Sequence, residues 1–213
     1  TAPHGSGLLA TYSLSEPPQL TIDACELSNN TATESGGPID ARGIDPLAAT
    51  VSLSSSTPVG NRVEHGTGGA IAVRLGALYV DSSVLASCRS NASGGGVYSE
   101  ASTLSLVNAT LASNSAGDRG GAVRADAGSL DIVESMLHDN VADGADGGGA
   151  LALSAVTTSL ARVTLERNSA PRGGAVAASA GAAVECIMCT LNENFAGKGG
   201  AMYATAATLT LTS

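Results

Sequence analysis

The chain has 213 residues, 27 of them Gly, with a single Phe and no Trp. Its formal net charge of −9, from 10 basic and 19 acidic residues, argues against a nucleic-acid backbone or an anionic membrane as partner, since both require clustered Lys and Arg. The hydrophobic content of 43% is too high for a disordered chain, and no apolar run approaches the roughly 18 residues of a membrane-spanning helix.

The two ends of the chain differ in how well they follow a repeat. Residues 1–17 fit it poorly and are predicted to be a connector or an incomplete coil. A regular pattern begins near Leu20, so residues 18–213 are predicted to form one repeat domain. The last residues, Leu209 to Ser213, stop within a strand-like alternation. We therefore expect an excerpt of a longer protein, whose targeting and anchoring signals lie outside this sequence.

The repeat has a period of 26 residues, seen in the leucines at Leu85, Leu111 and Leu137. Apolar residues that follow a Gly-Gly pair recur in phase, as at Val97 and Val123. A fixed period of this size is typical of a solenoid or array. Each unit contains about three short stretches that alternate with period two, which is typical of strands. The pattern predicts an all-β fold, a single-stranded right-handed parallel β-helix of about seven coils.

Stacked coils turn each repeat position into a column. The Asn three residues after the leucine is expected to lie inside a corner and to bond the Asn of the next coil, which satisfies its buried amide. Loss of one rung is expected to cost about 1–3 kcal/mol. Cys88 and Arg62 are predicted to take the Asn position in their coils and to break the ladder there. The predicted ladder consists of Asn30, Asn114, Asn140, Asn168 and Asn194.

Two segments carry a family resemblance. The residues from Asn114 to Val123 (NSAGDRGGAV) and from Asn194 to Met202 (NFAGKGGAM) resemble the paired FxxN and GGAI motifs of polymorphic outer membrane protein repeats. Those repeats belong to the pectin-lyase-like, right-handed β-helix group. The resemblance covers residues 20–213, with Leu or Val at the position of the motif's Phe. It implies a passenger or ectodomain exposed at a cell surface, often adhesive, and it implies no catalytic residues.

One column contains carboxylates on adjacent coils. Counting three residues past the apolar residue after each glycine pair gives Arg74, Glu100 and Asp126. Two carboxylates one coil apart would lie about 5 Å from each other, close enough to raise one pKa, to hold Ca²⁺ or to act as a retaining glycosidase pair. An ordinary ion pair of Arg74 with Glu100 is the alternative, and no His, Lys or aromatic residue shares the column.

Other polar clusters leave two interpretations open. The loop 139–146 carries three Asp residues, which leaves Ca²⁺ open, although the spacing is not that of an EF-hand. Arg119, Arg172 and Lys198 form a basic stripe along one corner, which could contact an acidic glycan or be a solvated edge. The sequence otherwise identifies no cofactor, no metal site and no catalytic residue.

Two kinds of residue indicate whether the protein is located in an oxidising, extracellular compartment: paired cysteines and N-glycosylation sequons. Cys186 and Cys189 are close enough for a local disulfide in an oxidising compartment, with free buried thiols as the alternative. Candidate N-glycosylation sites are Asn29, Asn91 and Asn108, each in an N-x-S/T triplet.

These observations favour a non-enzymatic structural or adhesive module, extracellular or at a cell surface. Its expected partners are other segments of the same protein, neighbouring surface proteins or glycans. The alternative is a polysaccharide lyase or glycoside hydrolase that uses Glu100 and Asp126. A flat ice-binding face is disfavoured, because Thr208-x-Thr210 has no equivalent on successive coils.

Overall fold

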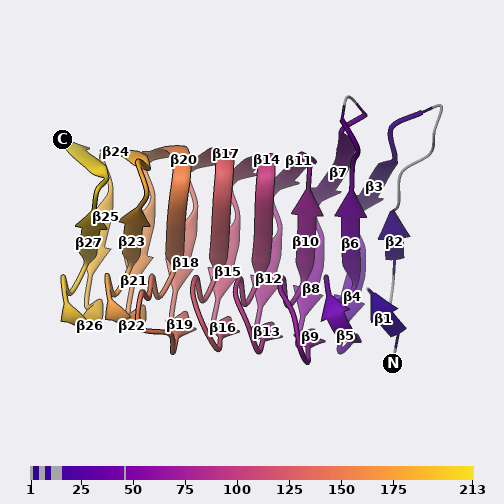
Figure 1. Ribbon diagram of the computed structural model, residues 1–213, viewed down its shortest axis with the longest axis horizontal. Coiled ribbons are helices and arrows are strands. Elements are labelled where there is room, and N and C mark those ends of the chain that lie inside the picture. Colours follow the sequence, from indigo (N-terminus) through magenta and orange to yellow (C-terminus); the bar gives the residue numbers. More distant parts are fainter. Residues whose placement is uncertain (1, 5–7, 11–15, 46) are drawn as a thin grey trace.

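The chain forms a parallel β-solenoid of about six turns, seen side-on in the computed structural model of Figure 1. The structure describes residues 2–4, 8–10, 16–45 and 47–213, and no helix occurs among them. The predictions of an all-β fold and of a parallel solenoid are confirmed. Every strand-to-strand register among the named strands is parallel, and each coil pairs with the coil before and after it.

One sheet of eight short strands runs along the solenoid, at the bottom of Figure 1. Its strands pair in chain order, each one coil further on. They are β1 (Ala2–His4), β5 (Thr31–Ser35), β9 (Arg62–Val63), β13 (Arg89–Ser90), β16 (Ser115–Ala116), β19 (Val141–Ala142), β22 (Ser169–Arg172) and β26 (Phe195–Lys198).

A second sheet has seven strands of three residues each. This sheet carries the leucine column of the repeat, for example Leu85 beside Leu111 and Leu111 beside Leu137. Its strands are β4 (Glu26–Ser28), β8 (Thr57–Val59), β12 (Val84–Ala86), β15 (Thr110–Ala112), β18 (Met136–His138), β21 (Thr164–Glu166) and β25 (Thr190–Asn192).

The third sheet has thirteen strands and two arms that meet at a bend. The long strands β14 (Val97–Val107), β17 (Val123–Val133) and β20 (Leu151–Ala161) run through both arms. The first arm adds β2 (Leu8–Ala10), β6 (Ile39–Arg42), β10 (Ile71–Arg74), β23 (Val176–Ser179) and β27 (Met202–Thr205). The second arm adds β3 (Gln19–Asp23), β7 (Ala49–Ser54), β11 (Gly76–Asp81), β24 (Ala183–Ile187) and β28 (Thr208–Thr212).

The predicted N-terminal connector, residues 1–17, is described only in part. Strand β1 pairs with β5 and β2 pairs with β6, so the backbone of these short strands continues the stack. Residues 1, 5–7 and 11–15 of the predicted connector lie outside the described residues.

Two insertions lengthen single coils by more than one residue. Arg42 pairs with Arg74 and Ala49 pairs with Gly76, so the first insertion lies at 43–48. The second lies between Ala142, at the end of β19, and Leu151, at the start of β20. Both are loops, because the strands on either side keep their register with the neighbouring coils.

The coils turn at residues in the left-handed conformation, many of them not glycine. At the bend of the thirteen-stranded sheet these are Leu75, Ala101 and Ala127, with φ values of 51°, 47° and 60°. The conformation costs roughly 1–2 kcal/mol for a residue with a Cβ, and the hydrogen bonds of the stacked coils offset this cost. Glycine is required at Gly120, where φ is 67° and a Cβ would lie 2.2 Å from the carbonyl oxygen of Val123.

The core lies inside the solenoid and consists of columns of aliphatic residues. Strand alternation places every second side chain inward, so that each coil contributes one or two residues per sheet. One fully buried column contains Ile71, Val97, Val123 and Leu151. Because aliphatic side chains stack on like side chains, the core needs few aromatic residues.

Candidate functional site

The outer face of the first arm carries charged side chains that contact one another across adjacent coils. In β10, β14 and β17 the register places Arg74 beside Glu100 and Glu100 beside Asp126. This is the column that the sequence predicts. A second outward column, two residues earlier in each strand, places Tyr98 beside Arg124. The two columns together form a polar network over several coils.

Asp40, at the N-terminal end of this network, is fully buried and strongly bonded. Its carboxylate accepts hydrogen bonds from Ser35 Oγ at 2.7 Å and from Arg42 Nη2 at 3.1 Å. Arg74 Nη1 approaches the same carboxylate to 3.3 Å. The buried carboxylate thus contacts two guanidinium groups from adjacent coils, and it fixes the positions of both arginines.

The two stacked carboxylates are each paired with an arginine. Arg74 Nε lies 3.3 Å from Glu100 Oε2, and Arg124 Nε donates to Asp126 Oδ2 at 2.9 Å. Arg124 is only 7% exposed, so its pairing with Asp126 is largely shielded from water. A general acid needs a proton and a nucleophile needs free lone pairs. Pairing with guanidinium disfavours both roles.

Tyr98 lies within the same network. Arg74 stacks over its ring at 5.0 Å from the centroid, and the Tyr98 hydroxyl donates to Glu100 Oε2 at 3.3 Å. Burial, and after it the negative charges of Glu100 and Asp126, raise the pKa of Tyr98 to about 12. The phenol is therefore neutral at physiological pH and acts as a hydrogen-bond donor.

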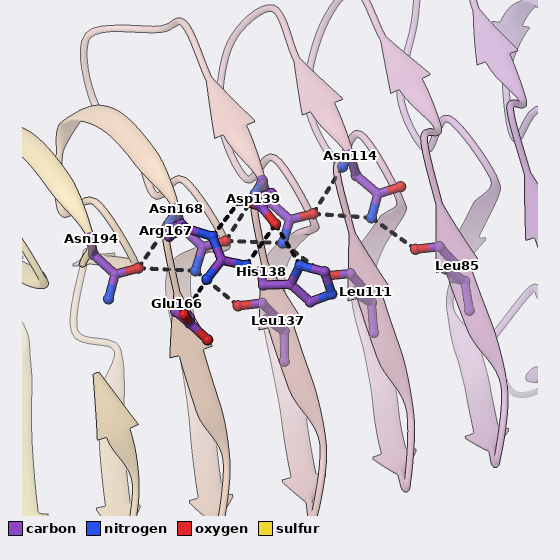
Figure 2. A network of polar contacts seen from close by, with 11 residues as sticks. Leu85, Leu111, Asn114, Leu137, His138, Asp139, Glu166, Arg167, Asn168 and Asn194 are labelled. Atoms are coloured by element: carbon purple, nitrogen blue, oxygen red, sulfur yellow. Dashed lines mark hydrogen bonds and ion pairs between the residues drawn. The ribbon is translucent and has the colours of Figure 1, made fainter. Parts of the chain in front are cut away.

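Inside the solenoid, asparagines form a ladder of side-chain hydrogen bonds, drawn in Figure 2. Asn114 Nδ2 donates to Asn140 Oδ1 at 3.1 Å, and Asn140 Nδ2 donates to Asn168 Oδ1 at 3.0 Å. Each Nδ2 also donates to a leucine carbonyl one coil back, as Asn140 does to Leu111 at 2.9 Å. Each Oδ1 also accepts the backbone N–H of the preceding Asn. Asn194 continues the ladder from Asn168, so buried amides and corner carbonyls satisfy one another.

The prediction that Arg62 breaks the ladder is wrong. The register places Pro58, and not Val59, in the column of Leu27, so the residue three positions later is Asn61. Asn61 is buried and accepts from Asn30 Nδ2 at 3.0 Å. Arg62 is exposed in β9. The strand pairs Val59–Ala86 and Arg62–Arg89 are 27 residues apart and not 26. Counting back from Leu85 in steps of 26 therefore reaches Val59 instead of Pro58.

Cys88 occupies the Asn position of its coil, as predicted. Its backbone N–H donates to Asn114 Oδ1 at 3.0 Å, and Asn61 Nδ2 approaches its Sγ to 3.8 Å. The chain of amide contacts therefore passes through a weak sulfur acceptor at this rung. Burial raises the pKa of the Cys88 thiol, which keeps it protonated and unreactive.

A disulfide joins Cys186 and Cys189, whose Cα atoms are 5.8 Å apart. Cys186 lies in the inward column of β24, beside Leu160 of β20. Cys189 lies next to the following corner, with its Sγ 3.5 Å from the Leu160 carbonyl oxygen. Cys25 is a free, exposed thiol.

The predicted glycosylation sites all lie at the surface. Asn29, Asn91 and Asn108 are exposed, and Asn29 and Asn108 occupy left-handed turn positions with φ values of 57° and 48°. A glycan on any of the three side chains would extend into solvent without displacing core residues. The side chain of Asn91 donates to the carbonyl of Glu64 at 2.6 Å, which is a bond that a glycan at Nδ2 would alter.

The acidic loop does not gather its carboxylates into one site. Asp139 pairs with Arg167 at 2.9 Å and Asp146 pairs with Arg172 at 2.8 Å. Among the described residues, no group of three or more His, Cys, Asp or Glu side chains is placed to hold a metal ion. Within the same residues no helix is long and apolar enough to cross a membrane.

The sequence analysis missed the second outward column, which contains Asp40, Tyr98 and Arg124. The signal was present as pairs of polar residues two apart in a strand: Asp40-x-Arg42, Tyr98-x-Glu100 and Arg124-x-Asp126. Residues two apart share one face of a strand.

Comparison of the chain with protein-family models, with curated proteins and with solved structures finds no match.

Proposed function

We propose that this chain is a non-enzymatic structural and adhesive module of a larger protein, extracellular or at a cell surface. The observation that carries the proposal is the ladder of asparagine hydrogen bonds, which runs from Asn30 to Asn61 and from Asn114 to Asn194 with Cys88 at the rung between them, and which joins successive coils of the parallel stack. Such a stack is a stiff rod with flat outer faces. A rod of this kind is suited to holding other domains apart and to contacting another surface, and less to catalysing a reaction.

Handedness and coil number are part of this proposal. We infer a right-handed solenoid, because parallel strands joined by a crossover strongly prefer right-handed connections. The inference of seven coils is supported by the seven strands of the sheet from β4 to β25. Both features match what the resemblance to pectin-lyase-like repeats implies.

The extracellular placement is supported by two features. Disulfides such as Cys186–Cys189 persist in oxidising compartments, and the three sequon asparagines are exposed, as acceptors of glycans must be. We propose that the partners are other segments of the same protein, neighbouring surface proteins or glycans, and that no nucleic acid is involved.

A polysaccharide lyase or glycoside hydrolase is the second candidate. Glu100 and Asp126 face outward on adjacent strands, at the strand spacing of about 4.7–4.9 Å, which approaches the carboxyl separation of retaining glycosidases. The pairing of each carboxylate with an arginine weighs against this candidate.

Depolymerisation assays separate the two candidates. The purified chain is incubated with acidic and neutral polysaccharides, with and without Ca²⁺, while reducing ends and unsaturated products are measured. We expect no product. Product formation that disappears in Glu100→Gln and persists in the control Glu134→Gln would establish the enzyme instead.

Adhesion is tested with coated beads. Beads that carry the folded chain are expected to be retained on cell surfaces more than beads that carry the heat-denatured chain. Equal retention of the two kinds of bead would contradict an adhesive role.

A further inference from the structure

A hollow lies on the outer face of the first arm, toward the C-terminal end of the polar network. In the second outward column, Arg124 is followed on successive coils by Ala152, Ala177 and Tyr203. Three strand spacings separate Arg124 from Tyr203, roughly 14 Å. Two methyl groups between two large side chains leave space, and a cavity of about 190 Å³ is lined by Arg124, Ala177 and Tyr203. We call this cavity the trough.

One wall of the trough comes from the corner that precedes each glycine pair. Backbone hydrogen bonds from Gly94, Gly120, Gly148 and Gly173 place four residues in one corner column, namely Arg119, Gly147, Arg172 and Lys198. This column contains the basic stripe of the sequence analysis. Gly147 has no side chain, so the rung between the two arginines is open. Arg119 and Arg172 both line the trough, while Ser179 and Thr205 line it from the neighbouring column.

Positive charge predominates in the lining. Three guanidinium groups, those of Arg119, Arg124 and Arg172, share the trough with one carboxylate, that of Asp146. Asp146 bridges two of them, at 2.8 Å from Arg172 and 3.3 Å from Arg119. The other acidic partners, Asp118 of Arg119 and Asp126 of Arg124, are not in the lining.

Two of these arginines have features of a binding site. Arg124 is only 7% exposed, and Arg119 Nε is buried without a hydrogen-bond partner among the described residues. Arg172 stacks over the ring of Tyr203 at 5.5 Å from the centroid. A partly exposed aromatic ring beside a cluster of guanidinium groups fits a ligand with an anionic group on a ring.

We propose that the trough binds a sulfated sugar, with the sulfate ester among the three arginines and the sugar ring against Tyr203. A sulfate ester has three free oxygens in a tetrahedral arrangement, and guanidinium groups donate to such oxygens in pairs. A carboxylate has only two oxygens, and Asp146 uses one for each of two arginines. Ser179 and Thr205 supply hydroxyl groups for the sugar. The ligand class rests on the proposed extracellular function, where sulfated glycans occur.

Asp146 acts as an internal competitor in this arrangement. It lies in the insertion between β19 and β20 and occupies the position between Arg119 and Arg172 that the sulfate would take. Its side chain is 52% exposed, so it can leave without breaking the stack. Removal of its charge should therefore strengthen the binding of an external anion.

The test is an NMR titration of the folded, isotope-labelled chain with N-acetylglucosamine 6-sulfate. We expect saturable shifts that centre on Arg119, Arg172 and Tyr203. Arg172→Ala should weaken binding about tenfold and Arg172→Lys by less, because a lysine keeps the charge but loses the fork. Asp146→Asn should tighten binding several-fold. The matched control is Arg162→Ala, whose arginine pairs with Glu134 on another face and should bind normally.

Further titrations identify the ligand chemistry. N-acetylglucosamine should give no saturable shift, and glucuronate should bind more weakly than the sulfate. Tighter binding of glucuronate would overturn the sulfate assignment, and so would the absence of a saturable shift with the sulfate. Unchanged binding in a folded Arg172→Ala variant would refute the trough as the site. The depolymerisation and bead assays do not depend on these outcomes, so the two proposals fail separately.

Discussion

The protein contains two ladders of polar side chains that run side by side, one buried and one exposed (Figure 2). The buried ladder repeats one geometry, with amide hydrogen bonds of 3.0–3.1 Å from Asn114 to Asn194. The exposed ladder joins Asp139 to Arg167 of the next coil and to the adjacent His138, and Asp139 is 40% exposed. Water can reach these contacts, whereas Asn114, Asn140 and Asn168 are fully buried. The difference indicates that the asparagine hydrogen bonds hold successive coils in register, whereas the surface ion pairs add little to the stability of the stack.

The largest expected effect comes from removal of a central rung. Asn140→Leu has a similar volume but leaves the Leu111 carbonyl and the backbone N–H of Asn114 buried without partners. Because each such group costs about 1–3 kcal/mol, we expect a loss of about 3–5 kcal/mol in the free energy of unfolding, measured by chemical denaturation. Asn192→Leu, at an exposed position of β25, is the control and should change it by less than about 0.5 kcal/mol.

The corrected register can be tested by a pair of neighbouring variants. Asn61→Leu should lower the free energy of unfolding by about 2–4 kcal/mol, because Asn61 bonds both Asn30 and the Leu27 carbonyl. Arg62→Ala should change it by less than about 0.5 kcal/mol, since Arg62 is exposed. A larger loss in Arg62→Ala than in Asn61→Leu would restore the register that the sequence suggested.

A smaller gain is expected when the weak rung is replaced. In Cys88→Asn the new amide can donate to Asn114 Oδ1 and accept from Asn61, as the other rungs do. We expect a rise of about 1 kcal/mol in the free energy of unfolding. A fall of the same size would mean that the corner at residue 88 cannot hold the larger side chain.

The exposed ladder should show the smallest effect, visible as a pH dependence. Hydrogen bonds from Arg167 and from His138 lower the pKa of Asp139 to about 2, against about 3.9 in an unfolded chain. The stabilisation is therefore complete above pH 4 and is lost as the pH falls toward 2. The difference in denaturation midpoint between Asp139→Asn and the unsubstituted chain should shrink over this range. High salt should also reduce it, whereas the effect of Asn140→Leu should persist.

The sequence predicted the ladder and the stack because both depend on a constant coil length. Leu85, Leu111 and Leu137 mark the phase, so columns such as Asn114 to Asn140 follow by counting. Counting fails where the length changes. Asn61 was missed because the next coil has one extra residue between Val63 and Ile71, so Arg62 and Arg89 are 27 residues apart.

The trough could not be predicted for a different reason. It arises where Ala177 leaves space beside Tyr203 and where Arg119 and Arg172, in a separate column, line the same cavity. Only the path of the insertion between β19 and β20 brings Asp146 to the same place. A repeat pattern specifies which residues are equivalent, but it does not specify how a loop of unusual length crosses an outer face.

The bends at Leu75, Ala101 and Ala127 have a consequence for how this protein can change in length. Equivalent bends are 26 residues apart at these positions. Each of these coils therefore starts and ends at the same point of the repeat, and one coil can be removed without changing the path of the next. Deletion of residues 111–136 would join Thr110 to Leu137, whose neighbours already share one register. Such a deletion would shorten the rod by about 4.8 Å without altering any corner. Loss or duplication of whole coils is thus a simple route by which such proteins can acquire different reach.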